Sequence, residues 1–497
     1  MNAAPFSIRI VAGKRPIVSI DDFYVAWDGI TFLFGESGIG KSMICKALYG
    51  LLDPDELDVT MGGAAYRMFL DSPASRDIRQ NSFFVFQEPS SHLDPLSRID
   101  GQLREGSLKG AGNEEEVLNQ LWQGSDLTKI QRILKLYPKP YRPSGGEKQR
   151  LLLAMAFKKI EAFQQAAPQG APTFFVFDEP TGSLDNAYRN RFLDMLFTHY
   201  RRRQFTAVVI THDYSIISEV RRRYADLTPR IHYRELERTG DATVRLDDFS
   251  PDDYLNWLSG ARGAAARAES DDRVLTVEPS FSVFGRKHTL FRDAGRTTPA
   301  PLVIRRGEMA YVKAPSGVGK TTLAKMVMGL YPADAAAMEL CGMKLSNKTP
   351  GRVWPDRIWG KRAAMVFQHA DESLNLESTV RQCFMGLPLK RTLDDAALRQ
   401  VLSEVFDGDL PGAFLSKRVK YLSGGQKQRL NLLRSLTLNT DLLILDEPLN
   451  GLDFRSVTKV ISILEQRRRA GAALLMISHN EEIFDAVVGP QSVYYLN

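Results

Sequence analysis

The sequence contains no run of about 18 apolar residues, the length that a membrane-spanning helix requires. Its first residues, MNAAPFSIRIVAGKRP, lack the apolar stretch of a secretory signal peptide. Cysteine is scarce, with only Cys45, Cys341 and Cys383 among 497 residues and no C-x-x-C pair. These absences argue against zinc or iron–sulfur ligation, fit a reducing compartment, and predict that any role at a membrane is peripheral.

A strong excess of one charge is also absent. The net charge is +6 with a pI near 9.0, which is mild for a chain of 55.8 kDa. The charge permits an anionic partner but does not indicate a dedicated nucleic-acid binder. Arginine runs at 201–203, 221–223 and 467–469 flank predicted helices and are interpreted as solvated faces. The length predicts at least two domains.

The sequence does contain a phosphate-loop pattern, G-x-x-x-x-G-K-[S/T], twice. GESGIGKS at 35–42 is complete, whereas APSGVGKT at 314–321 has Ala314 in place of the first glycine. An apolar segment expected to be a strand precedes each loop, and a helical pattern follows it, which is the context the motif requires. The backbone N–H groups at such a helix start form an anion site. The predicted phosphate-binding residues are Gly35, Glu36, Ser37, Gly38, Ile39, Gly40, Lys41 and Ser42 in the first loop, and Ala314, Pro315, Ser316, Gly317, Val318, Gly319, Lys320 and Thr321 in the second.

Four further motifs recur in the same order, which indicates a tandem duplication. They are FVFQEPSSHLDP and MVFQHADESLNL, PSGGEKQR and LSGGQKQR, FFVFDEPTGSLD and LLILDEPLNGLD, and AVVITHD and LLMISHN. The predicted domains are 1–258 and 273–497, joined by a linker at 259–272, SGARGAAARAESDD, which is small and polar. The segment YLNWL at 254–258 is expected to pack on the first domain. The other histidines (His92, His199, His232, His288 and His369) show no ligand spacing.

Together these motifs resemble the ATP-binding cassette (ABC) ATPase family, twice and over nearly the whole chain. The resemblance implies an α/β fold made of two tandem P-loop NTPase domains. Each domain is expected to hold a RecA-like α/β core, a helical signature subdomain and an antiparallel β region. The implied activity is hydrolysis of ATP with Mg²⁺.

Site roles follow from the motifs and from this resemblance. Asp178 and Asp446 each end an apolar strand, where a carboxylate suits the organisation of a metal. By resemblance, Glu179 and Glu447 are general bases and His212 and His479 contact the γ-phosphate. The expected Mg²⁺ ligands are Ser42, Gln87, Asp178, Thr321, Gln368 and Asp446. The signature residues are Ser144, Gly145, Gly146, Ser423, Gly424, Gly425 and Gln426, and the D-loop residues are Asp185 and Asp453.

In the family, the signature of one domain closes on ATP held by the other, so the two predicted sites are unequal. Site one combines the first phosphate loop with the second signature, and every element is standard. Site two combines the loop that carries Ala314 with a signature that begins with Pro143 instead of leucine. Its lysine, acid, base and histidine are all present, so we expect it to bind ATP and to hydrolyse it more slowly.

The segment after each Gln loop resembles that of peptide/nickel-type importer ATPases, which reads roughly F-Q-[D/E]-P-x-x-S-L-N-P. The match is close in the first half, whereas Ala370 and Leu376 replace the prolines in the second. The resemblance implies two transmembrane permease subunits, a substrate-binding protein reached through them, and a peripheral location on the cytoplasmic face of the inner membrane. Because both cassettes lie in one chain, a homodimer is not required.

Two alternatives remain open. Tandem cassette proteins that act on ribosomes share this architecture but carry a long charged linker, which is lacking here. A cassette pair that serves a cytosolic enzyme complex is not distinguished by the sequence. A DNA-repair type would bring zinc cysteines or coiled-coil insertions, and neither is present.

Overall fold

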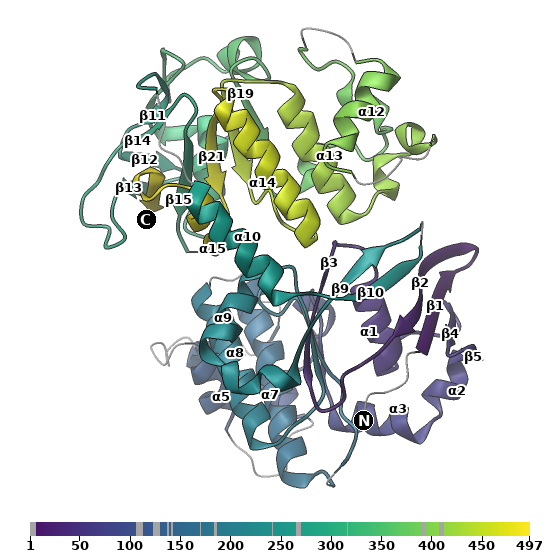
Figure 1. Ribbon diagram of the computed structural model, residues 1–497. Helices are drawn as coiled ribbons and strands as arrows, with labels where there is room; N and C mark the ends of the chain where they lie inside the picture. The colour runs from purple at the N-terminus through teal and green to yellow at the C-terminus, as the bar shows by residue number, and fades with distance from the viewer. Residues whose placement is uncertain are drawn as a thin grey trace. The chain divides into compact units, whose positions relative to one another are not determined.

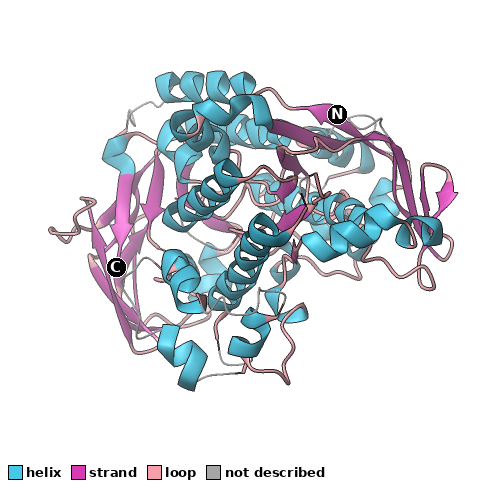
Figure 2. Cartoon of the chain, turned by 90° about the horizontal axis from the view of Figure 1, so that it is seen from below, coloured by secondary structure: helices cyan, strands magenta, loops and turns pink. Residues whose placement is uncertain are grey.

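The computed structural model describes residues 6–105, 113–122, 130–136, 139–140, 143–168, 170–182, 186–240, 242–264, 270–315, 317–389, 393–406 and 412–497. The chain divides into two compact units, Met1–Pro251 and Asp252–Asn497. In each unit helices flank the strands (Figure 1, Figure 2). Two predicted site residues, Asp185 and Ser316, lie outside the described residues. Within the described part of the chain, no helix is long and apolar enough to cross a membrane.

The first unit is built on a six-stranded sheet with β3 (Ile30–Gly35) near its centre. All six residues of β3 are buried, which explains why ITFLF reads as a continuous apolar run. The strand order is β10-β9-β3-β8-β7-β6, and β10 alone runs antiparallel to its neighbour. The other strands are β6 (Phe84–Val85), β7 (Phe175–Asp178), β8 (Ala207–Ile210), β9 (Ile231–Arg238) and β10 (Val244–Asp248).

Helices cover both faces of this sheet. Helix α1 (Lys41–Tyr49) packs between it and a small antiparallel sheet of order β2-β1-β4-β5, and Ile44 and Leu48 of α1 share one core with Ile10 of β1. On the opposite face lie α5, α7, α8 and α9 (Figure 1). The remaining bounds are β1 (Phe6–Ala12), β2 (Arg15–Phe23), β4 (Asp58–Met61), β5 (Ala64–Ala65), α2 (Tyr66–Leu70), α3 (Pro73–Asn81), α4 (Ile99–Arg104), α5 (Glu114–Leu121), α7 (Gly145–Ala166), α8 (Asn186–Arg202) and α9 (Ser215–Arg223).

The second unit repeats this plan with an eight-stranded sheet of order β16-β12-β13-β22-β15-β21-β20-β19. The five strands from β22 to β19 are parallel, and β13, β12 and β16 continue the sheet in antiparallel pairs. A separate antiparallel sheet has the order β14-β11-β17-β18. The bounds are β11 (Arg273–Val277), β12 (Ser280–Val283), β13 (Arg286–Phe291), β14 (Leu302–Arg305), β15 (Met309–Lys313), β16 (Ala333–Ala335), β17 (Ala337–Leu340), β18 (Met343–Ser346), β19 (Ala363–Val366), β20 (Leu442–Asp446), β21 (Ala473–Ile477) and β22 (Val493–Leu496).

Two buried clusters fill the second unit, one on each face of the parallel strands. One joins α11 to the antiparallel sheet, and the other joins α12, α13, α14 and α15. The tandem α/β plan predicted from the sequence, with a helical region and an antiparallel β region in each unit, is confirmed. The helices are α11 (Lys320–Val327), α12 (Asp395–Ser403), α13 (Gly424–Thr437), α14 (Phe454–Arg469) and α15 (Glu481–Val487).

The prediction for the segment before the second domain was wrong. Helix α10 (Pro251–Ala264) contains YLNWL and also residues 259–264 of the predicted linker. The Tyr254 hydroxyl donates to Glu482 at 2.7 Å, and the rings of Tyr254 and Trp257 lie 5.8 Å and 5.7 Å from the ring of Phe454. Spacing of i and i+3 places both aromatic rings on one helix face, and alanine favours the helical extension. YLNWL therefore packs on the second unit.

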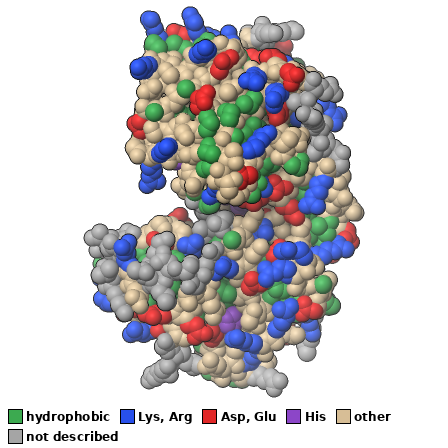
Figure 3. Space-filling view, turned by 90° about the vertical axis from the view of Figure 1, so that its left-hand side faces the viewer, with side chains coloured by type: hydrophobic (Ala, Val, Ile, Leu, Met, Phe, Trp, Pro, Cys, Tyr) green, Lys and Arg blue, Asp and Glu red, His purple; other side chains and the backbone are tan. Residues whose placement is uncertain are grey.

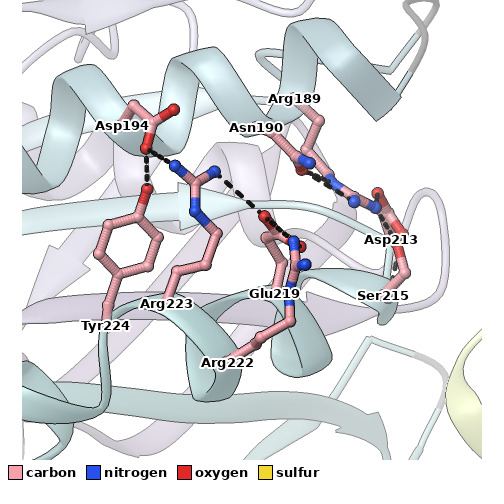
Figure 4. Close-up of polar contacts among 9 residues, drawn as sticks. All are labelled: Arg189, Asn190, Asp194, Asp213, Ser215, Glu219, Arg222, Arg223 and Tyr224. Carbon is pink, nitrogen blue, oxygen red and sulfur yellow. Dashed lines mark hydrogen bonds and ion pairs between the residues drawn. The ribbon is translucent and has the colours of Figure 1, made fainter.

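The arginine runs are largely engaged with carboxylates. Arg201 donates to Asp226 at 2.8 Å, and Arg223 pairs with both Asp194 and Glu219 (Figure 4). On the face drawn in Figure 3, Lys and Arg side chains are interspersed with Asp and Glu. This arrangement fits the interpretation of the runs as solvated faces.

Candidate functional site

The first phosphate loop connects β3 to α1 through three glycines with positive φ. Gly35, Gly38 and Gly40 have φ values of 131°, 78° and 116°. A Cβ at position 35 would lie 2.8 Å from the carbonyl oxygen of Leu236, and one at position 40 would lie 2.8 Å from Cγ2 of Val18. Both positions therefore need glycine for conformation and for space. The loop leaves its amides at the start of α1, where a phosphate can bind.

The second loop keeps this geometry without the first glycine. Gly317 and Gly319 have φ values of 79° and 121°, close to those of their counterparts, whereas Ala314 does not have a positive φ. The Lys320 Nζ donates to the carbonyl of Ala314 at 2.6 Å and lies 3.4 Å from that of Pro315. The Ala314 replacement thus changes how the backbone leaves β15 but preserves the turn that presents the amides.

The first loop's lysine is held in the same way. The Lys41 Nζ donates to the carbonyls of Gly35 and Glu36 at 2.6 Å and 3.0 Å. Burial lowers the pKa of Lys41, and the nearby carboxylates of Glu179 and Asp178 oppose that shift. Both loops therefore hold a buried ammonium group where the phosphates of a nucleotide would lie.

Asp178 and Asp446 end β7 and β20 with almost no exposure, at 3% and 1%. Burial raises the pKa of Asp178 to about 6 and also raises that of Asp446, although the hydroxyls of Ser42 and Thr321 beside them favour the ionised forms. Among the described residues, Oδ1 of Asp178 and both carboxylate oxygens of Asp446 accept no hydrogen bond of normal geometry. Buried oxygens without partners beside a hydroxyl suit a hard divalent cation such as Mg²⁺.

The described residues hold no group of three or more His, Cys, Asp or Glu side chains that could bind a metal ion by themselves. A cation between Asp178 and Ser42, or between Asp446 and Thr321, would take further ligands from a bound nucleotide, from water or from the predicted glutamines. This is the usual mode for Mg²⁺, which is held by few protein groups together with substrate phosphates.

The next residues, Glu179 and Glu447, adopt a left-handed backbone with φ values of 47° and 50°. Their amides donate to the carbonyls of Ile210 and Ile477 at 3.0 Å and 2.8 Å. A non-glycine residue in this region costs free energy, and such strain concentrates at functional sites. The same strain at matched positions of the two units indicates that each glutamate is held for a purpose.

The two glutamates differ in their partners. Oε1 of Glu179 lies 2.7 Å from Nδ1 of His212. Burial alone would lower the pKa of His212, but this carboxylate more than offsets it and the pKa is raised. Glu447 instead accepts from the Ser478 hydroxyl at 2.8 Å and from the His479 amide at 3.1 Å, with Nε2 of His479 at 3.5 Å. Burial raises the pKa of Glu447 to about 7.

In the second unit the structure brings the predicted residues together around one cavity of about 210 Å³. Gln87, the predicted counterpart of Gln368, is exposed after β6. The roles assigned to these residues stay predictions. The cavity is lined by Gly317, Gly319, Lys320, Thr321, Thr322, Gln368, Asp446, Glu447 and His479.

The signature serines and one D-loop residue are helix caps. Ser144 forms a capping box with Glu147 at the start of α7, and Ser423 forms the same box with Gln426 at the start of α13. The Asp453 carboxylate accepts from the Ser456 amide at 2.7 Å and caps α14. Because Glu and Gln both close a capping box, the glutamate in the first signature is structurally equivalent to the glutamine in the second.

A polar network behind His212 was not among the predictions from the sequence. Arg189 of α8, which is 7% exposed, donates to Asp213 at 3.2 Å and to the Ser215 hydroxyl (Figure 4). Asp213 also accepts from the Ser215 amide at 3.0 Å. The matching positions of the second unit are Val457 and Asn480. One sequence signal was available. The first half has both Arg189, four residues after the D-loop aspartate, and Asp213, directly after His212.

We expect Arg189→Leu to lower steady-state ATP turnover by on the order of tenfold, because the segment that carries His212 loses its anchor to α8. Arg191→Leu on the same helix serves as the control, since Arg191 is half-buried and, among the described residues, donates only to the Gln120 carbonyl. Turnover of Arg189→Leu equal to that of the control would show that this network does not position the histidine.

Comparison with known proteins agrees with this geometry. The family described as ABC transporter matches residues 19–182 and 298–450. The chain is 27% identical to the uncharacterized ABC transporter ATP-binding protein YejF of Escherichia coli (strain K12), over 92% of this chain and 86% of that protein. It is 26% identical to the peptidoglycan transport ATP-binding protein YejF of Agrobacterium fabrum, over 98% and 89%. It is 25% identical to the glutathione import ATP-binding protein GsiA of Salmonella paratyphi A, over 93% and 79%.

Among solved structures, the RNase-L Inhibitor matches with a TM-score of 0.63 at 17% identity, over 98% of this chain and 89% of that chain. An archaeal ribosome recycling factor matches with a TM-score of 0.61 at 17% identity, over the same shares. These likenesses show the fold alone. The family match spans both units and includes both phosphate loops. This chain therefore belongs to the ABC transporter family, and it is a nucleotide-binding ATPase with two cassette domains in one polypeptide.

Proposed function

We propose that this chain is the ATP-hydrolysing subunit of an importer, bound to two permease subunits on the cytoplasmic face of the inner membrane. Relatives that match it over nearly its whole length are named for peptidoglycan transport and for glutathione import. Both names refer to solutes that contain peptide bonds, so the proposed cargo is a small peptide or a peptide-bearing compound. A substrate-binding protein would deliver that cargo to the permeases.

The observation that carries the proposal is the segment after each Gln loop, which has the same structure in both units. A short 3₁₀ turn, Pro89–Ser91 or Ala370–Glu372, comes first. The carboxylate of Asp94 then accepts from the Leu96 amide at 2.9 Å, and the amide oxygen of Asn375 accepts from the Glu377 amide at 3.0 Å. Replacement of the two prolines in the second half has therefore not altered the turn.

A lysine on each signature helix contacts this segment. Lys148 of α7 donates to the Ser90 hydroxyl at 3.0 Å, and Lys427 of α13 donates to Asp371 at 3.1 Å. Next to the first turn, Leu96 is 81% exposed. An exposed apolar residue on a segment tied to the signature helix fits a surface that transmits the movement of that helix to a partner.

For hydrolysis, the phosphate loops bind the nucleotide through their amides and through Lys41 and Lys320. Bound Mg²⁺ would neutralise developing charge on the phosphates, with Asp178 and Asp446 positioned to hold it. Glu179 and Glu447 each accept a hydrogen bond from the attacking water and so orient it. Glu179 raises the pKa of His212, which favours the protonated ring that would present a positive group to the γ-phosphate in the first unit.

The test is to tag the chain in its native host, solubilise membranes gently and identify the proteins that copurify. Two polytopic permeases are the expected result. A Leu96→Cys variant should then crosslink to a permease, and Met68→Cys, which is 69% exposed on α2, is the control that should not. Recovery of ribosomes or of a soluble enzyme, with the chain absent from membranes, would replace this proposal with the tandem ATPase alternative.

A further inference from the structure

A histidine lies directly beneath the second phosphate loop. His288 of β13 is 6% exposed and faces Phe281 of β12 across the hairpin, with the two rings stacked at 5.1 Å. A Cβ at Gly319 would lie 2.6 Å from Cε1 and 3.0 Å from Nδ1 of His288. The imidazole is therefore packed against the α-carbon of the glycine that precedes Lys320, with no space between them.

The backbone of Val318 also acts on the ring electrostatically. Burial lowers the pKa of His288, and the backbone of Val318 acts in the opposite direction by favouring the protonated ring. That sign is expected when a ring N–H donates to a carbonyl oxygen. In a trans peptide the C=O and N–H groups point in opposite directions. A carbonyl of Val318 held by the ring would thus aim the N–H of Gly319 away from His288.

The side away from His288 is where a phosphate would lie, because Gly319 and Lys320 line the cavity described above. The amide of Gly319 is one of the donors expected to bind the anion. A side chain that fixes the orientation of this peptide removes conformational freedom that ligand binding would otherwise have to remove.

Among the described residues of the first unit, the nearest side chain beneath the matching glycine is apolar. Val18, which is 1% exposed, occupies the equivalent place beneath Gly40 and offers only methyl groups. The first loop begins with Gly35 at a φ of 131°, and the second begins with Ala314, which does not have a positive φ. His288 thus lies beneath the second loop, which is the loop that begins without a positive φ.

We propose that His288 is a positioning residue that fixes the Val318–Gly319 peptide of the second phosphate loop and thereby sets the affinity of that loop for ATP. The inference rests on the assignment of the second loop as a nucleotide site, not on the transport proposal. The affinities of the two loops could then be changed separately, because the described residues place His288 beneath Gly319 and Val18 beneath Gly40.

The test uses the full-length chain with the first loop disabled by Lys41→Ala and titrates it with fluorescent mant-ATP in the presence of Mg²⁺. Adding His288→Val, which gives the second loop the residue that the first has, should weaken binding roughly three- to tenfold, the usual effect of one lost hydrogen bond. His288→Gln should recover most of the affinity, because its side-chain amide can donate. A merely space-filling role would not distinguish Val from Gln in this way.

The matched control places His288→Val in a Lys320→Ala background, where binding at the first loop should not change. Thermal unfolding of each variant separates loss of the fold from loss of affinity. Equal affinity of the Val variant and its parent would overturn the inference, as would a Gln variant as weak as the Val variant. If Lys41→Ala alone abolished all binding, the second loop would not be an independent nucleotide site and the inference would fail with it.

Discussion

Glu179→Gln should lower ATP turnover by about 10²- to 10⁴-fold, the usual contribution of a general base, and Glu447→Gln should lower it less. Glutamine keeps the size and shape of the side chain, so the change removes the base with little disturbance of packing. Both glutamates sit in a strained left-handed backbone, which indicates that each is held in place for chemistry.

The difference between the two losses follows from their hydrogen-bond partners. Glu179 is paired with His212 at 2.7 Å, and this pairing raises the pKa of the histidine. Glu447 is 2% exposed and already accepts from the Ser478 hydroxyl and the His479 amide. Both bonds fall on Oε2, and they come from a hydroxyl and an amide, not from an imidazole ring nitrogen. The pairing that favours a protonated histidine is thus the one at Glu179, and the second glutamate, whose loop carries Ala314, is expected to make the smaller contribution to turnover.

The test is to measure steady-state phosphate release from both variants at saturating ATP and Mg²⁺. Glu339→Gln is the control, because Glu339 is exposed on β17 and should leave turnover unchanged. Equal losses in the two variants would show that the sites are catalytically equivalent in spite of Ala314. A larger loss from Glu447→Gln would reverse the assignment of the main hydrolytic site.

The motifs predicted the strands, loops and helices around each site because they have strong local signals. ITFLF and DLLIL are continuous apolar runs that only a two-sided buried strand explains, and glycine and lysine spacing identifies each loop. The loop that carries Ala314 has the same glycine turn as the first loop at Gly317 and Gly319, and its binding of phosphate stays a prediction. Local signals of this kind do not depend on the rest of the fold.

Contacts between segments distant in sequence were not predictable in this way. The aromatic side chains of α10 could have packed on either unit, and only the position of Phe454 decides the outcome. His288 has no motif around it, and its contact with Gly319 depends on how the β12–β13 hairpin crosses the loop. The same holds for Arg189, whose partner Asp213 is brought near by the packing of α8.

Asp178→Asn should raise the stability of the nucleotide-free chain while abolishing Mg²⁺-dependent ATPase activity. The folded-state pKa of Asp178 is about 6 against an ordinary value of 3.8, because burial penalises the charged form. The unfolded chain therefore releases this proton more readily, and stability is lost as pH rises from about 4 to about 6. A pKa shift of this size lowers the free energy of unfolding at high pH by on the order of 3 kcal/mol. The asparagine variant, whose side chain is neutral, would not lose this stability.

The stability gain should thus be present at pH 8 and disappear near pH 4, where Asp178 is protonated in both states. ATP with Mg²⁺ should raise the unfolding temperature of the wild-type chain, because a cation neutralises the buried carboxylate, and should raise that of Asp178→Asn much less. Asp446→Asn tests the matching position, where burial also raises the pKa. If Asp178→Asn were less stable than wild type at pH 8, or kept its metal-dependent turnover, the buried carboxylate would be a structural group. Higher stability together with lost activity is expected if the buried Asp178 carboxylate destabilises the fold but is needed to bind Mg²⁺.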